Sequence, residues 1–209
     1  MQTRVVLVRH GDSVHKAQGV IGGPQGCGGL TALGHEQAAQ LASKLAIQAV
    51  DWGSIAVYSS TLRRAQQTAA PIADRLGVRA DADCGLCTWH MPPYADGMPI
   101  DELNRDHSVD DGGVFRPFQH DNETWAELLT RVTRTLIDIA HRHRGGTIVV
   151  VAHAETVAAS FGGLGLLGHY YPFEPANVRN AAITEWVTDD EPARFPPARW
   201  TLVRFNDAS

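Results

Sequence analysis

The sequence predicts an α/β fold: a three-layer α/β/α sandwich with a mainly parallel, mixed sheet and an inserted lid segment. Two short segments, Thr3–Arg9 and Thr147–Ala152, contain uninterrupted apolar runs, as strands covered on both faces do. The longer segments between them repeat apolar residues at helical spacing. This order of strands and helices is typical of a parallel sheet with helices on both faces.

Length and composition predict one domain. The chain has 209 residues, of which 44% are hydrophobic and 20% charged, values that suit one sizeable core. We expect a single domain over residues 1–209. Residues 78–122 are rich in glycine, proline and aspartate and have no clear periodicity, so we expect them to form a lid inserted in this domain.

Charge and hydropathy exclude several classes of partner. The formal net charge is −5 and no basic stripe is present, so no nucleic-acid partner is expected. The apolar run at the N-terminus is too short for a signal peptide or a membrane span, so we expect a cytoplasmic protein without a membrane partner. The three cysteines form no even disulfide framework and fit a reducing compartment. An oligomer is compatible with the sequence, which does not predict its size.

Cap residues mark the beginnings of two helices. Thr31 is placed to cap a helix whose apolar residues recur at helical spacing. Thr124 and Glu127 have the spacing of a capping box and begin a later helix. Between these two, a helix with Arg64 in its first turn is expected to be kinked or divided at Pro71.

The remaining segments predict strands and one loop. Residues 55–58 predict a further strand, and residues 182–187 and 200–205 predict two edge strands. Residues 19–29 contain the glycine-rich string GGPQGCGG. This string lacks the Lys-Ser/Thr ending of a phosphate-binding P-loop, so we expect a flexible surface turn there.

Two of the predicted strands are followed by histidines, His10 and His153. In open parallel sheets, ligands bind at the carboxyl ends of the strands, so we expect both imidazoles at one crevice. Arg9 precedes the first histidine, and Arg64 lies where a helix N-terminus also favours an anion. Each histidine alone is as well explained as a polar residue at a strand end. Two imidazoles and two guanidiniums together favour a site for a tetrahedral dianion.

Short motifs in a fixed order extend over nearly the whole chain. They are Arg9-His10-Gly11; Leu30-Thr31 with Gly34 and Gln37-Ala38; Ser59-Ser60-Thr61-Leu62-Arg63-Arg64-Ala65 with Thr68-Ala69; Val151-Ala152-His153-Ala154; and Asn180-Ala181-Ala182-Ile183 with Trp200-Thr201-Leu202. In this set and order they resemble the motifs of the histidine phosphatase superfamily, the phosphoglycerate-mutase-like enzymes. An isolated Arg-His-Gly is weak evidence, whereas the ordered set is specific.

The resemblance implies a mechanism. His10 is implied to attack phosphorus with a ring nitrogen and become a phosphohistidine, which divides one difficult displacement into two easier ones. Arg9, Arg64 and His153 are implied to hold the phosphoryl oxygens and stabilise their charge. No metal or other cofactor is implied, because the arginines supply the positive charge.

The resemblance also implies contacts around the phosphate. Ser13 matches a hydroxyl that touches the phosphate in relatives, and the backbone amide of Ala154 is expected to do the same. Gly23 is expected at the mouth of the site. Lys16 stands where many relatives have asparagine, and a lysine there is still able to meet a phosphate.

One departure from the family pattern affects catalysis. Relatives protonate the leaving group with a carboxylic acid, commonly the glutamate of a stretch resembling Leu-x-Glu-Trp. Here that stretch is Leu86-Cys87-Thr88-Trp89. Threonine is not a general acid at neutral pH, and losing a positioned acid typically costs ~10²–10⁴-fold in rate.

Four residues are candidates for the missing acid. Glu155 follows the second histidine by two positions and is able either to reach the crevice or to cap the next helix. His90 lies close to the vacated position and is a comparable candidate. Asp83 and Glu102 are weaker candidates, because solvated lid residues are the simpler interpretation.

The same region offers ligands for a metal. Cys84, Cys87 and His90 form half of a zinc-binding pattern, and Cys27 would complete a Cys₃His set. Ordinary buried thiols are the simpler interpretation, and we predict no metal site. A redox role for the two closer cysteines is weaker still, because no thioredoxin-like context surrounds them.

These observations predict a metal-independent phosphatase that acts on a small phosphomonoester through a phosphohistidine. Residues 78–122 contain nine acidic residues and three arginines, a formal charge of −6, so a highly anionic substrate is expected to be repelled. The predicted partner is therefore a small phosphorylated metabolite with a neutral or cationic body. Two alternatives remain: an altered enzyme with a non-phosphatase reaction on an anionic metabolite, and a non-catalytic phosphate-binding module.

Overall fold

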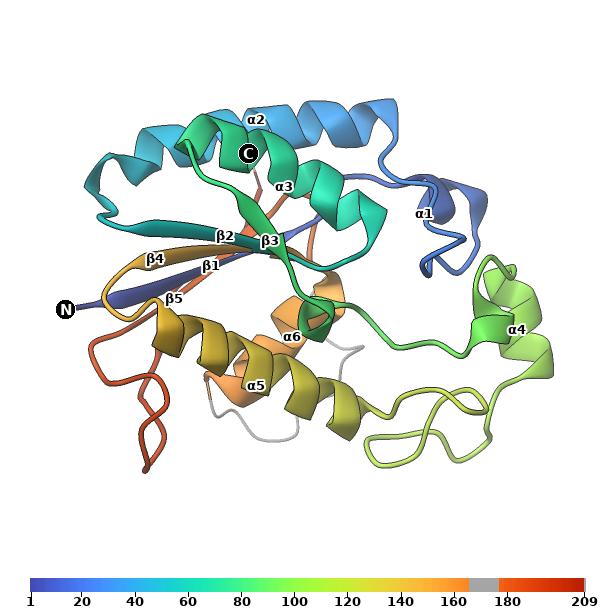
Figure 1. Ribbon diagram of the computed structural model, residues 1–209. Helices are drawn as coiled ribbons and strands as arrows, with labels where there is room; N and C mark the ends of the chain where they lie inside the picture. Colours follow the sequence, from blue (N-terminus) through green and yellow to red (C-terminus); the bar gives the residue numbers. More distant parts are fainter. Residues whose placement is uncertain (166–176, 209) are drawn as a thin grey trace.

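A six-stranded sheet forms the middle layer of the computed structural model, which describes residues 1–165 and 177–208 (Figure 1). The strands are β1 (Thr3–Arg9), β2 (Ile55–Ser59), β3 (Ala80–Ala82), β4 (Thr147–Ala152), β5 (Ile183–Thr188) and β6 (Thr201–Asp207). The helices are α1 (Val14–Gln18), α2 (Ala32–Gln48), α3 (Arg63–Leu76), α4 (Ile100–Asp106), α5 (Trp125–Arg142) and α6 (Ala154–Gly163), with 3₁₀ turns η1 (Ala49–Asp51), η2 (Cys84–Leu86) and η3 (Pro93–Ala95).

Helices cover both faces of this sheet. Figure 1 shows α2 and α3 on one side and α5 and α6 on the other. The strand order is β3-β2-β4-β1-β5-β6, and the pairs β3-β2, β2-β4 and β4-β1 are parallel, whereas β5 is antiparallel to both of its neighbours. The predicted fold class, a three-layer sandwich around a mainly parallel mixed sheet, is confirmed.

Successive side chains of the central strands point to opposite faces of the sheet and so contribute to two hydrophobic cores. In β1, Val5 and Leu7 belong to the core under α5 and α6, while Val6 and Val8 belong to the core under α2 and α3. All four are at most 1% exposed. Burying one such aliphatic side chain fully contributes about 1.5–3 kcal/mol, so the sheet is held from both sides.

The strand register brings the predicted histidines together. Arg9 of β1 is paired with Ala152 of β4, and Ser59 of β2 is paired with Val151 of β4. The residues that follow these three strands therefore leave the sheet at one edge. His10 and His153 are the first residues beyond β1 and β4, two adjacent strands.

The two predicted caps are confirmed. Thr31 Oγ1 accepts a hydrogen bond from the Gly34 amide at 3.1 Å at the start of α2. Thr124 and Glu127 form the reciprocal capping box of α5. Such caps satisfy amide groups that the first turn of a helix leaves without a partner.

Two expectations about elements differ from the structure, and one strand was not expected. The helix expected to be kinked or divided at Pro71 is not divided: it runs from Arg63 to Leu76, because its buried face, which includes Ala69 and Ile72, outweighs one missing hydrogen bond. Residues 182–187 were expected at an edge, but β5 lies between β1 and β6. The strand that was not expected is β3, whose three residues are largely exposed and have no apolar pattern.

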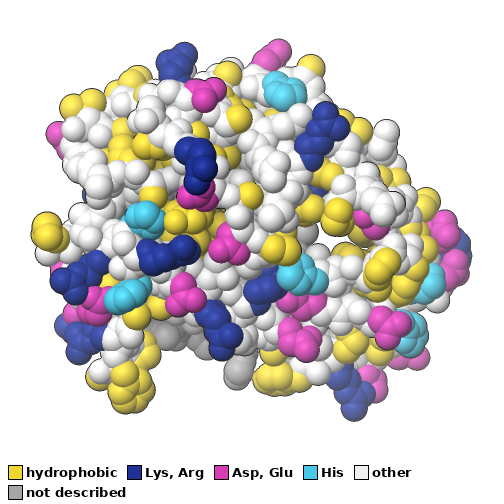
Figure 2. All heavy atoms as spheres, viewed as in Figure 1, with side chains coloured by type: hydrophobic (Ala, Val, Ile, Leu, Met, Phe, Trp, Pro, Cys, Tyr) yellow, Lys and Arg dark blue, Asp and Glu magenta, His cyan; other side chains and the backbone are white. Residues whose placement is uncertain are grey.

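The surface carries both signs of charge. On the face drawn in Figure 2, basic and acidic side chains are interspersed. Several acidic side chains lie at the right of this view, where Figure 1 places α4 and its flanking loops. This is part of the segment 78–122 that was expected to be acidic. Among the described residues, no helix has both the length and the apolar character needed to cross a membrane.

Candidate active site

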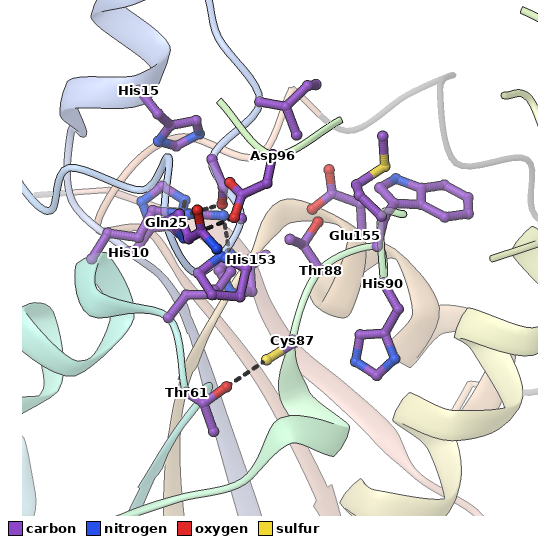
Figure 3. A pocket seen from close by; sticks show the side chains of 18 of the residues that line it. His10, His15, Gln25, Thr61, Cys87, Thr88, His90, Asp96, His153 and Glu155 are labelled. Atoms are coloured by element: carbon purple, nitrogen blue, oxygen red, sulfur yellow. Dashed lines mark hydrogen bonds between the residues drawn. The ribbon is translucent and has the colours of Figure 1, made fainter. Parts of the chain in front are cut away.

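A cavity of about 590 Å³ opens at the carboxyl ends of β1, β2 and β4 (Figure 3). Eight of the ten residues predicted for the site line it: Arg9, His10, Gly23, Arg64, His90, His153, Ala154 and Glu155. The imidazole rings of His10 and His153 have centroids 5.2 Å apart. The strand ends thus bring two distant parts of the chain into one hollow.

His10 has a defined tautomer. Its Nδ1 lies 2.7 Å from the Gly11 carbonyl oxygen, which only accepts, so Nδ1 carries the proton. Its Nε2 accepts a hydrogen bond from Arg64 Nε at 3.2 Å. The ring is only 4% exposed. The unprotonated nitrogen of a buried imidazole therefore faces a guanidinium.

Arg64 lies between the two histidines. Its Nη2 is 3.4 Å from His153 Nδ1, and its Nη1 donates to the Gly22 carbonyl oxygen at 2.7 Å. Because a guanidinium only donates, His153 Nδ1 is the acceptor and its Nε2–H donates to Ser60 Oγ at 2.7 Å. The guanidinium thereby fixes the orientation and tautomer of both rings.

Burial and positive charge keep the imidazoles neutral. Burial, followed by the charge of Arg64, lowers the pKa of His10 and of His153 well below the usual value of a histidine. The same two causes lower the pKa of His15 to about 4. The positive charge of the floor of the cavity therefore comes from Arg9 and Arg64.

Two buried polar atoms near His10 lack a partner. Arg9 donates through Nη1 to the Val178 carbonyl oxygen. Within the described part of the chain, Arg9 Nε and Ser13 Oγ are buried and have no hydrogen-bond partner. Buried polar groups are costly when unpaired, so Arg9 in the cavity wall is suited to an anionic ligand.

The N-terminus of α6 adds backbone donors. His153 is the N-cap residue and makes no side-chain cap, so the amides of the first turn, which begins at Ala154, are not satisfied by it. Ala154 lines the cavity. Helix N-termini with free amides favour anions, which is consistent with the contact predicted for this residue.

The motif residues outside the cavity hold the loop that follows β1. The Gly11 amide donates to Thr68 Oγ1 at 3.1 Å, and this hydroxyl donates to the Arg64 carbonyl oxygen at 2.8 Å. A Cβ placed on Gly34 would lie 2.0 Å from the Asp12 carbonyl oxygen. The ordered motifs therefore position His10 relative to Arg64 and leave no space for a side chain at residue 34.

Two predicted contact residues lie outside the cavity lining. Lys16 is exposed on α1, and Ser13 is fully buried just before that helix. Neither is among the residues that line the cavity. Their roles in phosphate binding stay predictions.

The glycine-rich segment 19–29, expected as a flexible surface turn, contributes to the wall of the cavity. Gly22 is buried and Gly23 lines the cavity. Asp96, from the segment expected as a lid, accepts hydrogen bonds from the amides of Gln25 and Gly26 at 2.7 and 2.8 Å. These hydrogen bonds hold the loop in place as one wall of the cavity. The sequence did not predict this position, because it depends on contacts to a distant segment that has no periodic pattern.

His15 is a cavity residue that the sequence analysis missed. Its ring centroid lies 6.3 Å from that of His10, and its Nδ1 is buried without a partner among the described residues. A Cβ on Gly22 would meet the His15 ring at 2.4 Å, so this ring packs directly on the glycine loop. His15 follows His10 by only five positions and lies in the first turn of α1. This closeness in sequence was the feature that could have predicted a place near the cavity.

The candidate acids differ in position. Glu155 points its carboxylate into the cavity, and burial lowers the pKa of Arg9 while the charge of Glu155 opposes that shift (Figure 3). His90 also lines the cavity, but its ring points away from His10 in Figure 3. Asp83 caps η2 through the Gly85 amide at 2.8 Å, and Glu102 lies on α4; neither lines the cavity.

The cysteines do not form the Cys₃His set that was considered. Cys84, Cys87 and His90 lie together, with their ligand atoms within 4.8 Å of one another. Cys27 is not part of this group, and its Sγ accepts a hydrogen bond from Arg64 Nη1 at 3.2 Å. This thiol belongs to the surroundings of the guanidinium instead.

Known proteins resemble this chain in sequence and in fold. A family described as the histidine phosphatase superfamily (branch 1) matches residues 5–208. The uncharacterized protein Rv0525 of Mycobacterium tuberculosis is 45% identical over 156 residues, which are 73% of each chain. The metal-independent phosphoserine phosphatase of Arabidopsis thaliana is 28% identical over 165 residues, 76% of this chain and 67% of the relative.

A solved structure shares the whole architecture. The mycobacterial glucosyl-3-phosphoglycerate phosphatase Rv2419c, determined with VO3, superposes with a TM-score of 0.81 at 22% identity, over 99% of this chain and 100% of that one. At this identity the likeness concerns the fold alone. The family match and the mycobacterial relative decide the assignment: the chain belongs to the histidine phosphatase superfamily, which confirms the family and the phosphatase class of enzyme that its motifs predict.

Proposed function

We propose that this protein hydrolyses a small phosphomonoester through a phosphohistidine formed on His10, with no metal in the reaction. The observation that supports this most is the state of the His10 ring. Its Nδ1–H is held by the Gly11 carbonyl oxygen, its Nε2 is unprotonated, and its pKa is lowered by burial and by Arg64. A nucleophilic imidazole needs a free nitrogen lone pair, and this arrangement provides one at neutral pH.

In the first step, His10 Nε2 attacks phosphorus and the bond from phosphorus to the leaving oxygen breaks. Arg64 Nε gives up its bond to His10 and donates to a phosphoryl oxygen, together with Arg9 Nε and the first amides of α6. The Gly11 carbonyl oxygen keeps its bond to Nδ1–H and stabilises the positive ring of the phosphohistidine. In the second step, water attacks phosphorus, the bond to Nε2 breaks, and phosphate leaves.

Glu155 is proposed as the general acid of the first step and the base of the second. It protonates the leaving oxygen, and its carboxylate then takes a proton from the attacking water. Thr88 lines the cavity without an acidic proton. Asp96 is already engaged, because its two carboxylate oxygens accept the amides of Gln25 and Gly26. Glu155 is therefore the carboxyl group in the cavity lining that is available for proton transfer.

The walls of the cavity favour an uncharged or cationic substrate body. Above the arginines, the lining includes apolar side chains: Val20, Ile21, Trp89, Met91 and Ile100. Asp96 and Glu155 are the acidic residues of this lining. Such a cavity accepts one phosphoryl group on its positive floor and disfavours a second anionic group near its mouth.

Relatives support the reaction class. The Arabidopsis protein is named a metal-independent phosphoserine phosphatase, and the mycobacterial structure is that of a glucosyl-3-phosphoglycerate phosphatase. By their names, both act on an organic phosphate ester. We take from them the class of substrate, a phosphomonoester, and not its identity.

Replacing the nucleophile tests the proposal. His10→Ala is expected to reduce turnover of p-nitrophenyl phosphate by roughly three orders of magnitude or more, because the covalent route is lost. The wild-type enzyme should trap an acid-labile phosphoryl group on the peptide that contains His10. His35→Ala, on the exposed side of α2, is the matched control. Turnover that persists in His10→Ala contradicts the nucleophile assignment, and phosphate binding without turnover in the wild type favours the binding module.

Replacing the acid should depend on the leaving group. Glu155→Gln is expected to lower kcat by about 10²–10⁴-fold for an alkyl phosphate, whose leaving oxygen needs a proton. The same change should have a much smaller effect on the first step with p-nitrophenyl phosphate, because nitrophenolate leaves without protonation. Glu36→Gln on the exposed surface of α2 serves as the control. Equal losses with the two substrates would remove Glu155 from this role.

Neutral buried imidazoles predict how stability depends on pH. The folded-state pKa values of His10 and His153 are lowered, whereas a histidine in the unfolded chain has a pKa of about 6.5. Below about pH 6.5 the unfolded state therefore binds more protons, and the free energy of unfolding should fall by up to about 1.4 kcal/mol per pH unit for each histidine. Urea unfolding between pH 7.5 and 5 measures this. A free energy of unfolding that is constant or rises as the pH falls would contradict neutral rings.

Substrate charge should decide specificity. Glycerol phosphate and phosphoethanolamine are expected to have a kcat/KM at least about tenfold above that of a bisphosphate of similar size, because of the acidic mouth. Asp96→Asn should reduce this difference in kcat/KM between the monophosphates and the bisphosphate. Asp74→Asn, on the exposed side of α3, should leave the difference unchanged. Preference for the bisphosphate at equal ionic strength would refute the proposed substrate class.

A further inference from the structure

Two thiols and an imidazole meet in the wall of the cavity. Cys84 and Cys87 flank the 3₁₀ turn η2, and His90 follows one short loop later. Their ligand atoms, two Sγ and one ring nitrogen, all lie within 4.8 Å of one another. Cys84 Sγ and His90 Nε2 are 3.5 Å apart. The phosphatase reaction proposed above uses none of these three groups.

The separation of one sulfur and the imidazole nitrogen matches an edge of a tetrahedral metal site. With Zn–S bonds of about 2.3 Å and Zn–N bonds of about 2.05 Å, tetrahedral angles place sulfur and nitrogen about 3.6 Å apart and two sulfurs about 3.8 Å apart. The observed 3.5 Å between Cys84 Sγ and His90 Nε2 agrees with the first value. The ligand atoms therefore need little movement to enclose an ion.

The backbone that carries the ligands is fixed by Arg131 of α5. Its Nη1 donates to the carbonyl oxygens of Gly85 and Cys87 at 3.1 and 3.0 Å, and its Nη2 donates to that of Thr88 at 3.1 Å. Glu123 pairs with this guanidinium at 2.7 Å and accepts the His90 amide at 3.0 Å. The ion pair of Arg131 and Glu123 thus holds the backbone of the cysteine turn and the backbone of His90.

The turn also packs tightly on α5. A Cβ on Gly85, between the two cysteines, would lie 2.1 Å from Thr135 Oγ1. This close approach requires glycine there and keeps η2 against the helix. A preorganised backbone of this kind lowers the entropic cost of gathering three ligands around one ion.

The two thiols already have polar neighbours. Thr61 Oγ1 lies 3.1 Å from Cys87 Sγ, and His90 Nε2 lies 3.5 Å from Cys84 Sγ. A thiolate is the form of cysteine that binds metal, and a bound cation releases the proton of each thiol that coordinates it.

We propose that Cys84, Cys87 and His90 bind one thiophilic divalent cation, Zn²⁺, whose fourth coordination position opens to the cavity. Two Zn–S bonds and one Zn–N bond form, the thiol protons still present are released to solvent, and no redox partner is needed. All three residues line the cavity, so a water molecule or a substrate group is able to fill the fourth position.

The set is complete without Cys27. That thiol accepts a hydrogen bond from Arg64 and is fully buried beside Leu62 and Cys87. A cation on the three ligands would tie residues 84–90 together and so fix the wall that includes Thr88. Cys84, Cys87 and His90 take no part in the steps proposed at His10, so the two proposals can be tested separately.

Metal binding to the full chain tests this proposal. The protein, kept reduced with a phosphine and freed of metal by chelation, is titrated with Zn²⁺ against a chromophoric chelator and with Co²⁺ by absorption. We expect one equivalent of each, with thiolate-to-cobalt charge transfer. Cys84→Ser, Cys87→Ser and His90→Ala should each weaken binding by more than about 100-fold. Losing a residue that only supports a ligand typically costs about 10–100-fold. Cys27→Ser and His35→Ala should retain it.

A second measurement needs no variant. Zn²⁺ should protect Cys84 and Cys87 of the unaltered chain from iodoacetamide, as located by mass spectrometry of peptides. Repeating the titration in His10→Ala separates the two proposals, because loss of turnover there leaves the metal site intact. The proposal would be overturned if the variant that combines Cys84→Ser, Cys87→Ser and His90→Ala binds Zn²⁺ as strongly as the unaltered chain. It would also be overturned if the reduced protein takes up no Zn²⁺ and gains no protection.

Discussion

The guanidinium of Arg64 is the group on which the arrangement of the site depends. It is buried between two imidazoles that follow adjacent strands, and it donates to both rings and to the Gly22 carbonyl oxygen. Within the part of the chain that the structure describes, its donors go to nitrogen, oxygen and sulfur acceptors and not to a carboxylate. A buried charge without a counterion is costly, so a bound anion restores balance there. Burial, and after it the same charge, lowers the pKa of His10 and of His153, so the group that attracts the anion also helps to keep the nucleophile neutral.

Sequence reasoning predicted the parts of the site that the sheet itself positions. His10 and His153 follow apolar runs, and parallel pairing of those runs necessarily brings their ends together. His15, Asp96 and the packed glycine loop were missed, because their positions depend on contacts between irregular segments that have no periodic pattern. Three-residue β3 was missed for a similar reason: a short exposed edge strand has no apolar alternation to detect. Pro71 was judged by local propensity, which tertiary packing overrode.

Thr88 stands where the family pattern has an acid, and another carboxyl group lies in the same cavity. Thr88 and Glu155 line it together, from the loop after η2 and from the first turn of α6. A carboxyl group that enters from α6 is attached to the same helix terminus that offers amides to the phosphate, so its position relative to phosphorus is set by a rigid element. An acid on this helix, as we propose for Glu155, would leave the loop after η2 free to carry other side chains.

The floor of the cavity and the wall after η2 differ in chemistry. The floor of the cavity is made of guanidiniums and neutral imidazoles, which select a hard, highly charged oxyanion. The wall after η2 presents two sulfurs and an imidazole, which select a soft cation. Arg131 and Glu123 fix this wall through its backbone and leave its side chains available. Cys27, Leu62 and Cys87 pack together as one small buried cluster, and Cys27 Sγ in this cluster accepts a hydrogen bond from Arg64. The guanidinium of Arg64 also donates to His10 Nε2, so the thiol cluster and the imidazole of His10 share one neighbour.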